Sequence, residues 1–194
     1  MFLFDVGVIG TAFRKNEADA LTKELFEIMS NDFNCLCSGR KWRTCISGGA
    51  AGSDHLGVIA RLGGVARSLT LCVPGRFDVK TCQFVETDEN GRAVYYKRDV
   101  DTANYYHRQF KEKTGIDSLA QIKDLIEKEM VTIRSYNSFV DRNKVIANHA
   151  RYLVAYTFGQ DQPGSSGTMH TWRMHEYAGN GVRIHRSIPE LGKE

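Results

Sequence analysis

Short apolar runs alternate with amphipathic segments in the first part of the chain. Residues 6–10 are apolar and end in glycine, which is typical of a strand buried on both faces. A helical periodicity follows over residues 16–29, and we interpret residues 30–41 as a polar connector. The apolar positions that define this helix are Ala18, Leu21, Leu25, Ile28 and Met29.

The alternation continues to residue 73. Two apolar runs, residues 44–47 and residues 69–73, predict the second and third strands. Leu56, Ile59 and Leu62 lie between them at helical spacing, and the glycine pair at 63–64 is a helix stop signal. A strand-helix-strand-helix-strand order requires right-handed crossovers and therefore a parallel sheet.

Residues 76–140 break this rhythm. Asn90 followed by Gly91 predicts a tight hairpin bend. Ser118 with Gln121 three positions later predicts a capping box that opens a helix to about Met130. We interpret residues 76–140 as an insertion that closes over one end of the sheet, and not as a separate domain.

The strand-helix rhythm resumes after the insertion. Asp141 is a suitable N-cap for a helix to residue 150, and residues 152–156 predict the fourth strand. After a loop and a further helix to residue 177, residues 182–184 predict a fifth strand at the sheet edge. The pattern therefore predicts an α/β fold: a single Rossmann-like domain over residues 1–194, with a mostly parallel five-stranded sheet flanked by helices and an inserted helical and hairpin segment.

Composition fits one globular domain. The 194 residues suffice for one buried core, and 42% hydrophobic with 25% charged residues is ordinary for such a protein. The net charge of +3 fits an anionic small ligand as well as nucleic acid and selects neither. The N-terminus lacks a basic region, and no apolar stretch approaches the ~20 residues of a membrane span. We expect a soluble, cytoplasmic protein with no membrane partner.

The cysteines and histidines do not form a metal-site pattern. The five cysteines are an odd count without framework spacing, so we expect reduced thiols, with Cys45 and Cys72 buried in apolar runs. His170 and His175 are five positions apart, and not the four that place two imidazoles on one helical face. We expect no metal site and no cofactor.

Parallel-sheet geometry brings four separated segments together. Helices that follow parallel strands begin at the carboxyl edge of the sheet, where ligands bind at the point of strand-order reversal. Glycine-rich turns at such helix starts let backbone N–H groups and the helix dipole meet an anion. The candidate ligand-binding residues are Gly10, Thr11, Arg14, Gly48, Gly49, Ala50, Gly52, Ser53, Asp54, Arg142, Asn143, Gly164, Ser165, Ser166, Gly167 and Thr168.

Each of these residues also has a structural interpretation. Glycines after a strand often only form turns, and Asp54 or Thr168 could cap a helix. Arg142 and Asn143 lie in the first turn of a predicted helix, where a cation is unfavourable, and this favours an anionic partner. The aromatic residues of the insertion could stack a base, but packing is the commoner use; they are Tyr95, Tyr96, Tyr105, Tyr106 and Phe110.

Two common nucleotide motifs are absent. Neither glycine-rich loop ends in the Gly-Lys-Ser/Thr of a phosphate-binding loop, which argues against magnesium-dependent ATP hydrolysis. The first strand is not followed by G-x-G-x-x-G, which argues against a redox dinucleotide site.

Three motifs together resemble the SLOG superfamily. Residues 46–54 read Ile-Ser-Gly-Gly-Ala-Ala-Gly-Ser-Asp, residues 141–143 read Asp-Arg-Asn, and residues 164–168 read Gly-Ser-Ser-Gly-Thr. This superfamily includes the lonely-guy phosphoribohydrolases, the DNA-processing protein A family and the YspA/YpsA-like proteins, and the chain is most similar to the YspA-like branch. The resemblance covers about residues 6–73 and 140–184, and the insertion does not match.

The resemblance implies a nucleotide or nucleotide-derived ligand at the glycine loops, bound for sensing or sequestration, and it is compatible with a homodimer because SLOG proteins commonly pair. It also leaves an enzyme open as the alternative. The phosphoribohydrolases carry PGGxGTxxE, whose glutamate supports cleavage of an N-glycosidic bond, and Thr171 replaces that glutamate here. Asp54 or Glu176 would then be the catalytic carboxylate, with Arg142 holding phosphate. A DNA-binding module is the least favoured reading, because the basic residues are scattered: Arg40, Lys41, Arg43, Arg183 and Arg186.

Overall fold

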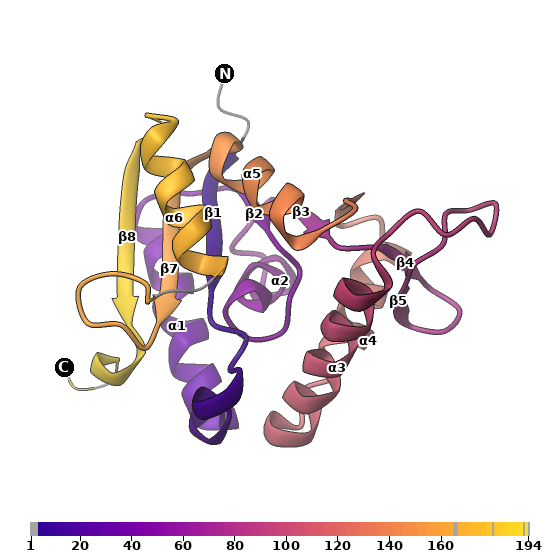
Figure 1. Ribbon diagram of the computed structural model, residues 1–194. Coiled ribbons are helices and arrows are strands. Elements are labelled where there is room, and N and C mark those ends of the chain that lie inside the picture. The colour runs from indigo at the N-terminus through magenta and orange to yellow at the C-terminus, as the bar shows by residue number, and fades with distance from the viewer. Residues whose placement is uncertain (1–3, 165–166, 180, 192, 194) are drawn as a thin grey trace.

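A sheet of six parallel strands forms the centre of the protein in the computed structural model, which describes residues 4–164, 167–179, 181–191 and 193 (Figure 1). The spatial order of the strands is β6-β3-β2-β1-β7-β8, so the direction of winding reverses between β1 and β7. The strands are β1 (Phe4–Gly10), β2 (Thr44–Ser47), β3 (Ser68–Val73), β6 (Thr132–Ser135), β7 (Ala150–Thr157) and β8 (Val182–Ser187). The α/β Rossmann-like class is confirmed.

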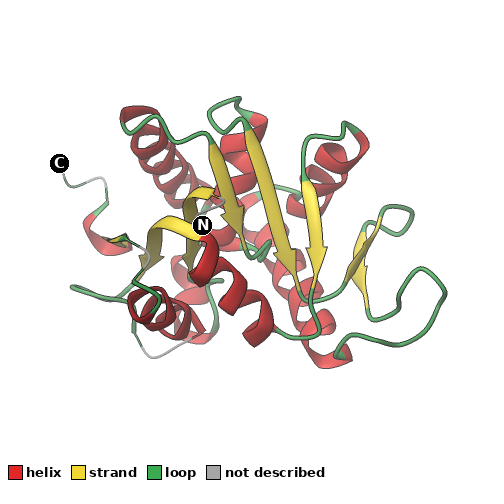
Figure 2. Ribbon diagram, turned by 90° about the horizontal axis from the view of Figure 1, so that it is seen from above, coloured by secondary structure: helices red, strands yellow, loops and turns green. Residues whose placement is uncertain are grey.

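Helices cover both faces of this sheet (Figure 2). One hydrophobic core lies between the sheet and four helices: α1 (Lys23–Gly39), α2 (Leu56–Leu62), α3 (Lys97–Thr114) and α4 (Ser118–Glu127). A second core lies between the opposite face and two helices: α5 (Phe139–His149) and α6 (Gly167–Tyr177). Val8 faces the first core and Ile9 the second, which is the alternation of a strand buried on both faces.

The first helix differs from its prediction. Lys15–Ala20 forms a short 3₁₀ turn, η1, and α1 begins only after Thr22, whose hydroxyl accepts a hydrogen bond from the Leu25 N–H at 3.1 Å. The connector expected over residues 30–41 is wrong, because α1 continues to Gly39. Phe33 and Cys37 extend the buried face of the helix by two turns.

The insertion contributes a sixth strand to the sheet, so the predicted count of five was one too low. Its β6 pairs in parallel with β3 at the sheet edge, where Thr132 and Arg134 are exposed. An edge strand with polar outward positions lacks the continuous apolar run by which the central strands were recognised. The insertion also holds an antiparallel hairpin of β4 (Arg76–Asp78) and β5 (Gln83–Val85).

The turn at Asn90 and Gly91 is confirmed. Gly91 has a φ of +77°, and Thr87 and Ala93 form an antiparallel bridge across the turn. Two helix caps differ from their predictions by a few residues. Asp117, and not Ser118, caps α4, and Ser138, and not Asp141, caps α5.

The insertion shares the core of the first face. The ring of Phe110 in α3 meets that of Phe26 in α1 edge-on, with centroids 4.8 Å apart. Ile122 and Leu125 of α4 belong to the same buried cluster. Cys45 and Cys72 are buried, as expected from their apolar surroundings. Among the described residues, no helix has the length and apolar character needed to cross a bilayer.

Truncating Phe110 to alanine should lower the free energy of unfolding by about 3–5 kcal/mol, because it leaves a cavity between α1 and α3. We expect one cooperative urea transition followed by both circular dichroism and Trp fluorescence, since the insertion and the sheet share this core. Tyr177→Ala, at a side chain that is 86% exposed, is the control and should change stability by less than about 0.5 kcal/mol. Two separate transitions would show that residues 76–140 fold independently.

Candidate functional site

The carboxyl edge of the sheet brings together the segments singled out in the sequence (Figure 1). The Ser53 N–H donates to the Thr11 carbonyl at 3.0 Å, and the Thr168 hydroxyl donates to the Gly10 carbonyl at 2.9 Å. Contacts from α5 complete the arrangement, since Arg142 Nη1 donates to the Gly48 carbonyl. We call this contacting set the rim: residues 10–14, 48–54, 142–143 and 167–168.

The remaining candidates join the rim unequally. Asn143 Nδ2 donates to the Gly167 carbonyl at 3.5 Å, which links α5 to the start of α6. Gly164 is exposed in the loop before α6. Ser165 and Ser166 lie outside the described residues.

An ion pair between Asp54 and Arg142 lies beneath the surface of the rim. Arg142 Nη2 is 3.6 Å from Asp54 Oδ2, and both side chains are less than 10% exposed. The guanidinium also stacks on Phe139, at 4.8 Å from its ring centroid. Its Nε is buried without a hydrogen-bond partner among the residues that the structure describes. Arg142 therefore joins the loop after β2 (residues 48–54, called the second-strand loop below) to α5, and its guanidinium is directed toward protein groups.

The Asp54 carboxylate occupies the place that the sequence suggested for an anion. Burial raises the pKa of Asp54 from 3.8 to about 6, and Arg142 together with backbone hydrogen bonds from Ala50 and Gly10 opposes that rise. The backbone groups of two rim loops thus converge on a carboxylate of the protein itself.

Glycine is required here for close approach. A Cβ atom on Gly48 would lie 2.3 Å from Asp54 Oδ2 and 2.8 Å from Arg142 Nη1. A Cβ atom on Gly10 would lie 2.2 Å from the Tyr156 carbonyl oxygen. These glycines let the loops pack against the ion pair and against β7, a role that the turn-forming interpretation did not include.

Arg14 is the exposed cation of the rim. Its guanidinium lies 4.8 Å from the ring centroid of Tyr106 in α3 and 5.7 Å from that of Phe139 in α5. It forms no salt bridge with a carboxylate among the described residues, but its charge, like that of Arg142, lowers the pKa of the buried Asp54 carboxyl. The neighbouring Phe13 and Lys15 have φ values of 53° and 51°, a left-handed conformation that costs a non-glycine residue about 1 kcal/mol or more. Arg14 itself is extended, with φ −88° and ψ 151°, and the left-handed residues on either side of it define its position.

Thr11 and Glu17 hold this loop. The Thr11 hydroxyl accepts from the Phe13 N–H at 2.8 Å and donates to the Glu17 carboxylate. Sequence analysis did not select Glu17, because its position in a predicted helix gave no sign that it turns back to the first loop.

A buried histidine from the insertion supports the second-strand loop. His107 of α3 donates from Nε2 to the Gly49 carbonyl at 3.1 Å and accepts at Nδ1 from the Ser118 hydroxyl at 2.8 Å. Its burial lowers its pKa from 6.5 to about 3. His107 was not among the predicted site residues, because a single histidine in an amphipathic helix carries no signal of a contact 58 residues away.

His55 is the second buried histidine near the rim. Its Nε2 lies 2.6 Å from Gln121 Oε1, and its ring contacts those of Phe26 and Phe110. Burial lowers its pKa to about 4. Both imidazoles are therefore neutral at physiological pH.

Glu176 lies away from the rim. It is at the C-terminal end of α6, where Arg183 binds its carboxylate through two hydrogen bonds of 2.7 and 3.1 Å. The adjacent His175 lies 3.1 Å from the carbonyl of Ala150, the first residue of β7, so this end of α6 is at the amino edge of the sheet. Glu176 is thus at the opposite end of the sheet from Asp54 and is not available as a partner for it.

Thr171, at the position of the phosphoribohydrolase glutamate, is buried and donates to the Gly167 carbonyl one turn earlier in α6 at 3.1 Å.

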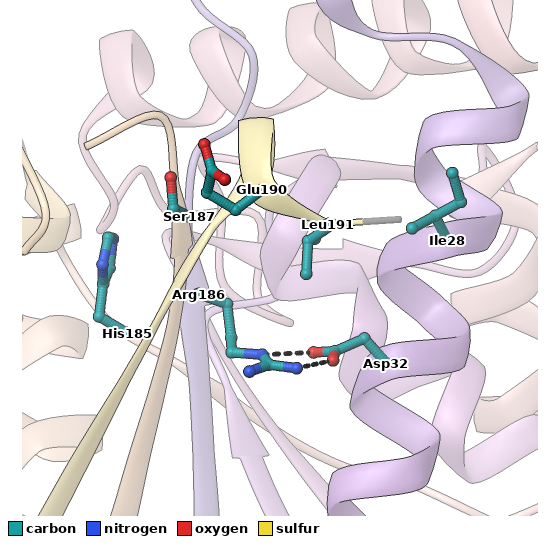
Figure 3. Close-up of a pocket in the computed structure, with 7 residues that line it drawn as sticks. All are labelled: Ile28, Asp32, His185, Arg186, Ser187, Glu190 and Leu191. Carbon is teal, nitrogen blue, oxygen red and sulfur yellow. Dashed lines mark hydrogen bonds and ion pairs between the residues drawn. The ribbon is translucent and has the colours of Figure 1, made fainter. Parts of the chain in front are cut away.

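A cavity of about 160 Å³ lies beside the end of β8 (Figure 3). Arg186 and Asp32 form a hydrogen-bonded ion pair on its wall, and the Tyr156 hydroxyl donates to Asp32 at 2.6 Å. The Asp32 carboxylate is therefore satisfied by protein groups. Its lining residues are Ile28, Asp32, His185, Arg186, Ser187, Glu190 and Leu191.

Replacing Arg142 by glutamine should lower the free energy of unfolding at pH 7 by about 3–5 kcal/mol, because the Asp54 carboxylate would stay buried without its counter-charge. Below the Asp54 pKa of about 6 that carboxyl takes up a proton, so the loss should be smaller at pH 5. Urea unfolding at both pH values measures this, and Asp54→Asn with Arg142→Gln is the control, expected to cost less than the two single changes added. An equal loss at both pH values would contradict this account of the pair.

Acid should destabilise the protein through its buried histidines. The unfolded chain takes up protons on His55 and His107 below pH 6.5, and the native state does so only near pH 4 and 3, so this stability is present above pH 6.5 and is lost as the pH falls. His107→Gln keeps an N–H donor for Gly49 and cannot titrate. It should reduce the loss of unfolding free energy between pH 7 and pH 5 by about 1–2 kcal/mol in urea titrations. An unchanged pH dependence would show that His107 is protonated equally in both states.

Comparison with known proteins gives one full-length similarity. The chain is 29% identical over 189 residues to an uncharacterized protein of Acanthamoeba polyphaga mimivirus, covering 94% of this chain and 96% of that protein. No protein-family model matches the chain, and no solved structure matches it significantly. The chain is therefore similar over almost its whole length to a viral protein of about the same size.

Proposed function

We propose that the protein binds a nucleoside phosphate at the rim and acts by sensing or sequestering that ligand. The observation that carries the proposal is Arg14, an exposed guanidinium held against Tyr106 and Phe139 that forms no salt bridge with a carboxylate among the described residues. A cation held in this way is suited to charge-assisted hydrogen bonds with phosphate.

The position of Arg14 in the fold supports the same ligand. It follows β1, which lies beside β7 where the strand order reverses, and ligands of open parallel sheets bind in that crevice. The start of α6 reaches the same place through Thr168 and its contact with Gly10. No acidic residue occupies the first turn of this 11-residue helix, so its N–H groups and dipole add positive potential.

Asp54 and Arg142 have a supporting role in this proposal. Arg142 is directed at Gly48 and Asp54, and it therefore shapes the second-strand loop instead of contacting the phosphate directly. The charge that meets the ligand comes from Arg14 and from the start of α6.

The test is binding of nucleoside 5′-monophosphates by calorimetry, with thermal shift as the second readout. Arg14→Gln should weaken binding by about 10-fold to 100-fold, because it removes one charged hydrogen-bonding partner of the phosphate. Arg67→Gln removes the same charge from an exposed arginine directly before β3, at the amino edge of the sheet, and should leave the affinity unchanged. Equal losses of affinity in the two variants would show that Arg14 acts only through the net charge of the protein and makes no specific contact with the phosphate. Glycine positions are unsuitable for this test, since a Cβ atom at Gly49 would lie 2.7 Å from Val73 Cγ1.

A hydrolase that cleaves the N-glycosidic bond is the second candidate, and the environment of Asp54 favours it. A buried carboxyl with a pKa near 6 beside a guanidinium is the kind of perturbed group found at catalytic sites. In its ionised form it would stabilise the oxocarbenium charge that develops on the ribose.

Incubating the protein with nucleoside monophosphates and measuring free base by chromatography tests this candidate. The rate should rise through about pH 6 as Asp54 ionises, and Asp54→Asn should abolish it. Release that is unaffected by Asp54→Asn, or no release from any of the monophosphates, would eliminate Asp54 as a catalytic carboxylate.

A further inference from the structure

A second cavity lies next to the rim, between the first loop and the insertion. It has a volume of about 220 Å³. One wall comes from the loop after β1 and from η1, and the other comes from α3. Its lining residues are Ala12, Phe13, Lys15, Ala18, Leu21, Tyr105, Tyr106, Gln109, Phe110 and Lys113.

The α3 wall is one face of a helix. The five residues that it contributes recur at spacings of one, four, five and eight positions from Tyr105, which places them together on the helix surface. Phe110 is buried at the base, while Tyr105 is 49% exposed and leaves the upper wall open to solvent. The cavity therefore has an aromatic floor and wall with access from outside.

Polar groups lie among these aromatic residues. Lys15 and Lys113 offer ammonium donors. The Lys113 ammonium is 3.4 Å from a carboxylate oxygen of Asp19. The Asp19 side chain is 99% exposed, so water screens this ion pair. Gln109 donates from Nε2 to Glu112 at 2.8 Å, which leaves its Oε1 as an acceptor. An aromatic site with ammonium donors and one amide acceptor matches a flat heterocycle that carries a carbonyl oxygen beside a ring N–H.

The size of the cavity limits what it can hold. Sites that enclose a whole drug-sized ligand have volumes of roughly 300–1,000 Å³. A cavity of about 220 Å³ holds one ring system, and the rest of the ligand must lie outside it.

The cavity and the rim share residues. Ala12 and Phe13 line the cavity and belong to the rim loop, and the Phe13 N–H donates to the Thr11 hydroxyl at 2.8 Å. Tyr106 lines the cavity and also contacts the guanidinium of Arg14. A ligand with its phosphate at Arg14 would therefore have its ring system directed toward α3.

We infer that this cavity is the base subsite of the proposed nucleotide site, and that it takes an oxo base such as guanine or uracil. The inference rests on the proposed function. Guanine and uracil present a carbonyl acceptor next to a ring N–H donor, which complements the two lysines and Gln109. Adenine and cytosine present an amino group beside a ring nitrogen at that edge. Gln109 could accept from the amino group, but the ring nitrogen has one lone pair and accepts from only one of the two ammonium groups, whereas a carbonyl oxygen accepts from both.

The experiment compares binding of GMP, UMP, AMP, CMP, ribose 5-phosphate, guanosine and uridine to the full chain by calorimetry. We expect GMP or UMP to bind at least about 10-fold more tightly than AMP, CMP and ribose 5-phosphate. Ala18→Trp fills the cavity from η1 and should reduce the affinity for GMP or UMP to that for ribose 5-phosphate. Ala20→Trp makes the same change in the same 3₁₀ turn outside the cavity and should preserve the preference.

A second variant keeps the test informative if Ala18→Trp does not fold. Gln109→Met retains the shape of the side chain and removes the acceptor, so it should lower the affinity for GMP or UMP by about 10-fold and leave that for ribose 5-phosphate unchanged.

Each failure is distinguishable. Equal binding of ribose 5-phosphate and all four nucleotides, or a preference that survives Ala18→Trp, would overturn the base subsite and leave the phosphate rim in place. Binding of guanosine or uridine as tight as that of their monophosphates, and sensitive to Ala18→Trp, would support the cavity and overturn the phosphate proposal. Absence of binding by every compound would overturn both.

Discussion

The ion pair of Asp54 and Arg142 is the interaction on which the geometry of the carboxyl edge depends. It crosses from the second-strand loop to α5 and is buried at the point where these segments meet. Removing two charges from water is costly, so such a pair persists only where hydrogen bonds compensate for the lost hydration. The Gly48 carbonyl and the backbone groups of Gly10 and Ala50 supply them. The loops keep their shape because they complete this buried pair.

The insertion also supports the loops at the carboxyl edge, although it contains none of the three sequence motifs. His107 of α3 binds the Gly49 carbonyl, and Tyr106 of the same helix holds Arg14 in place. Asp99 at the start of α3 accepts a hydrogen bond from the Phe139 N–H at 3.0 Å and so caps the beginning of α5. One helix therefore contacts two separate parts of the rim and the start of α5, and any ligand bound there would be bounded by the insertion as well as by the sheet.

The pattern of apolar residues along the chain predicted the central strands and the general position of the loops. The central strands were recognisable because burial on both faces produces continuous apolar runs, and convergence of the loops followed from parallel topology alone. The edge strand β6 was missed because Thr132 and Arg134 face solvent and are polar, so the strand has no continuous run of apolar residues. The structure brings most of the predicted site segments together at one edge of the sheet. Arg142 was predicted to hold a phosphate, whereas the structure pairs it with Asp54, 88 positions earlier in the chain. Glu176 was proposed as a substitute for the glutamate that Thr171 replaces, and a three-turn helix places it at the other end of the sheet.

The close packing around Gly48 has a consequence for how such a sequence can diverge. The space that a methyl group would need is already taken by the Asp54 carboxylate and the Arg142 guanidinium. A larger residue at position 48 therefore becomes acceptable only if both charged side chains have been replaced. Replacing either one alone leaves the other buried without its counter-charge. Positions 48, 54 and 142 are therefore coupled, and in distant relatives we expect all three residues to be retained or all three to be substituted.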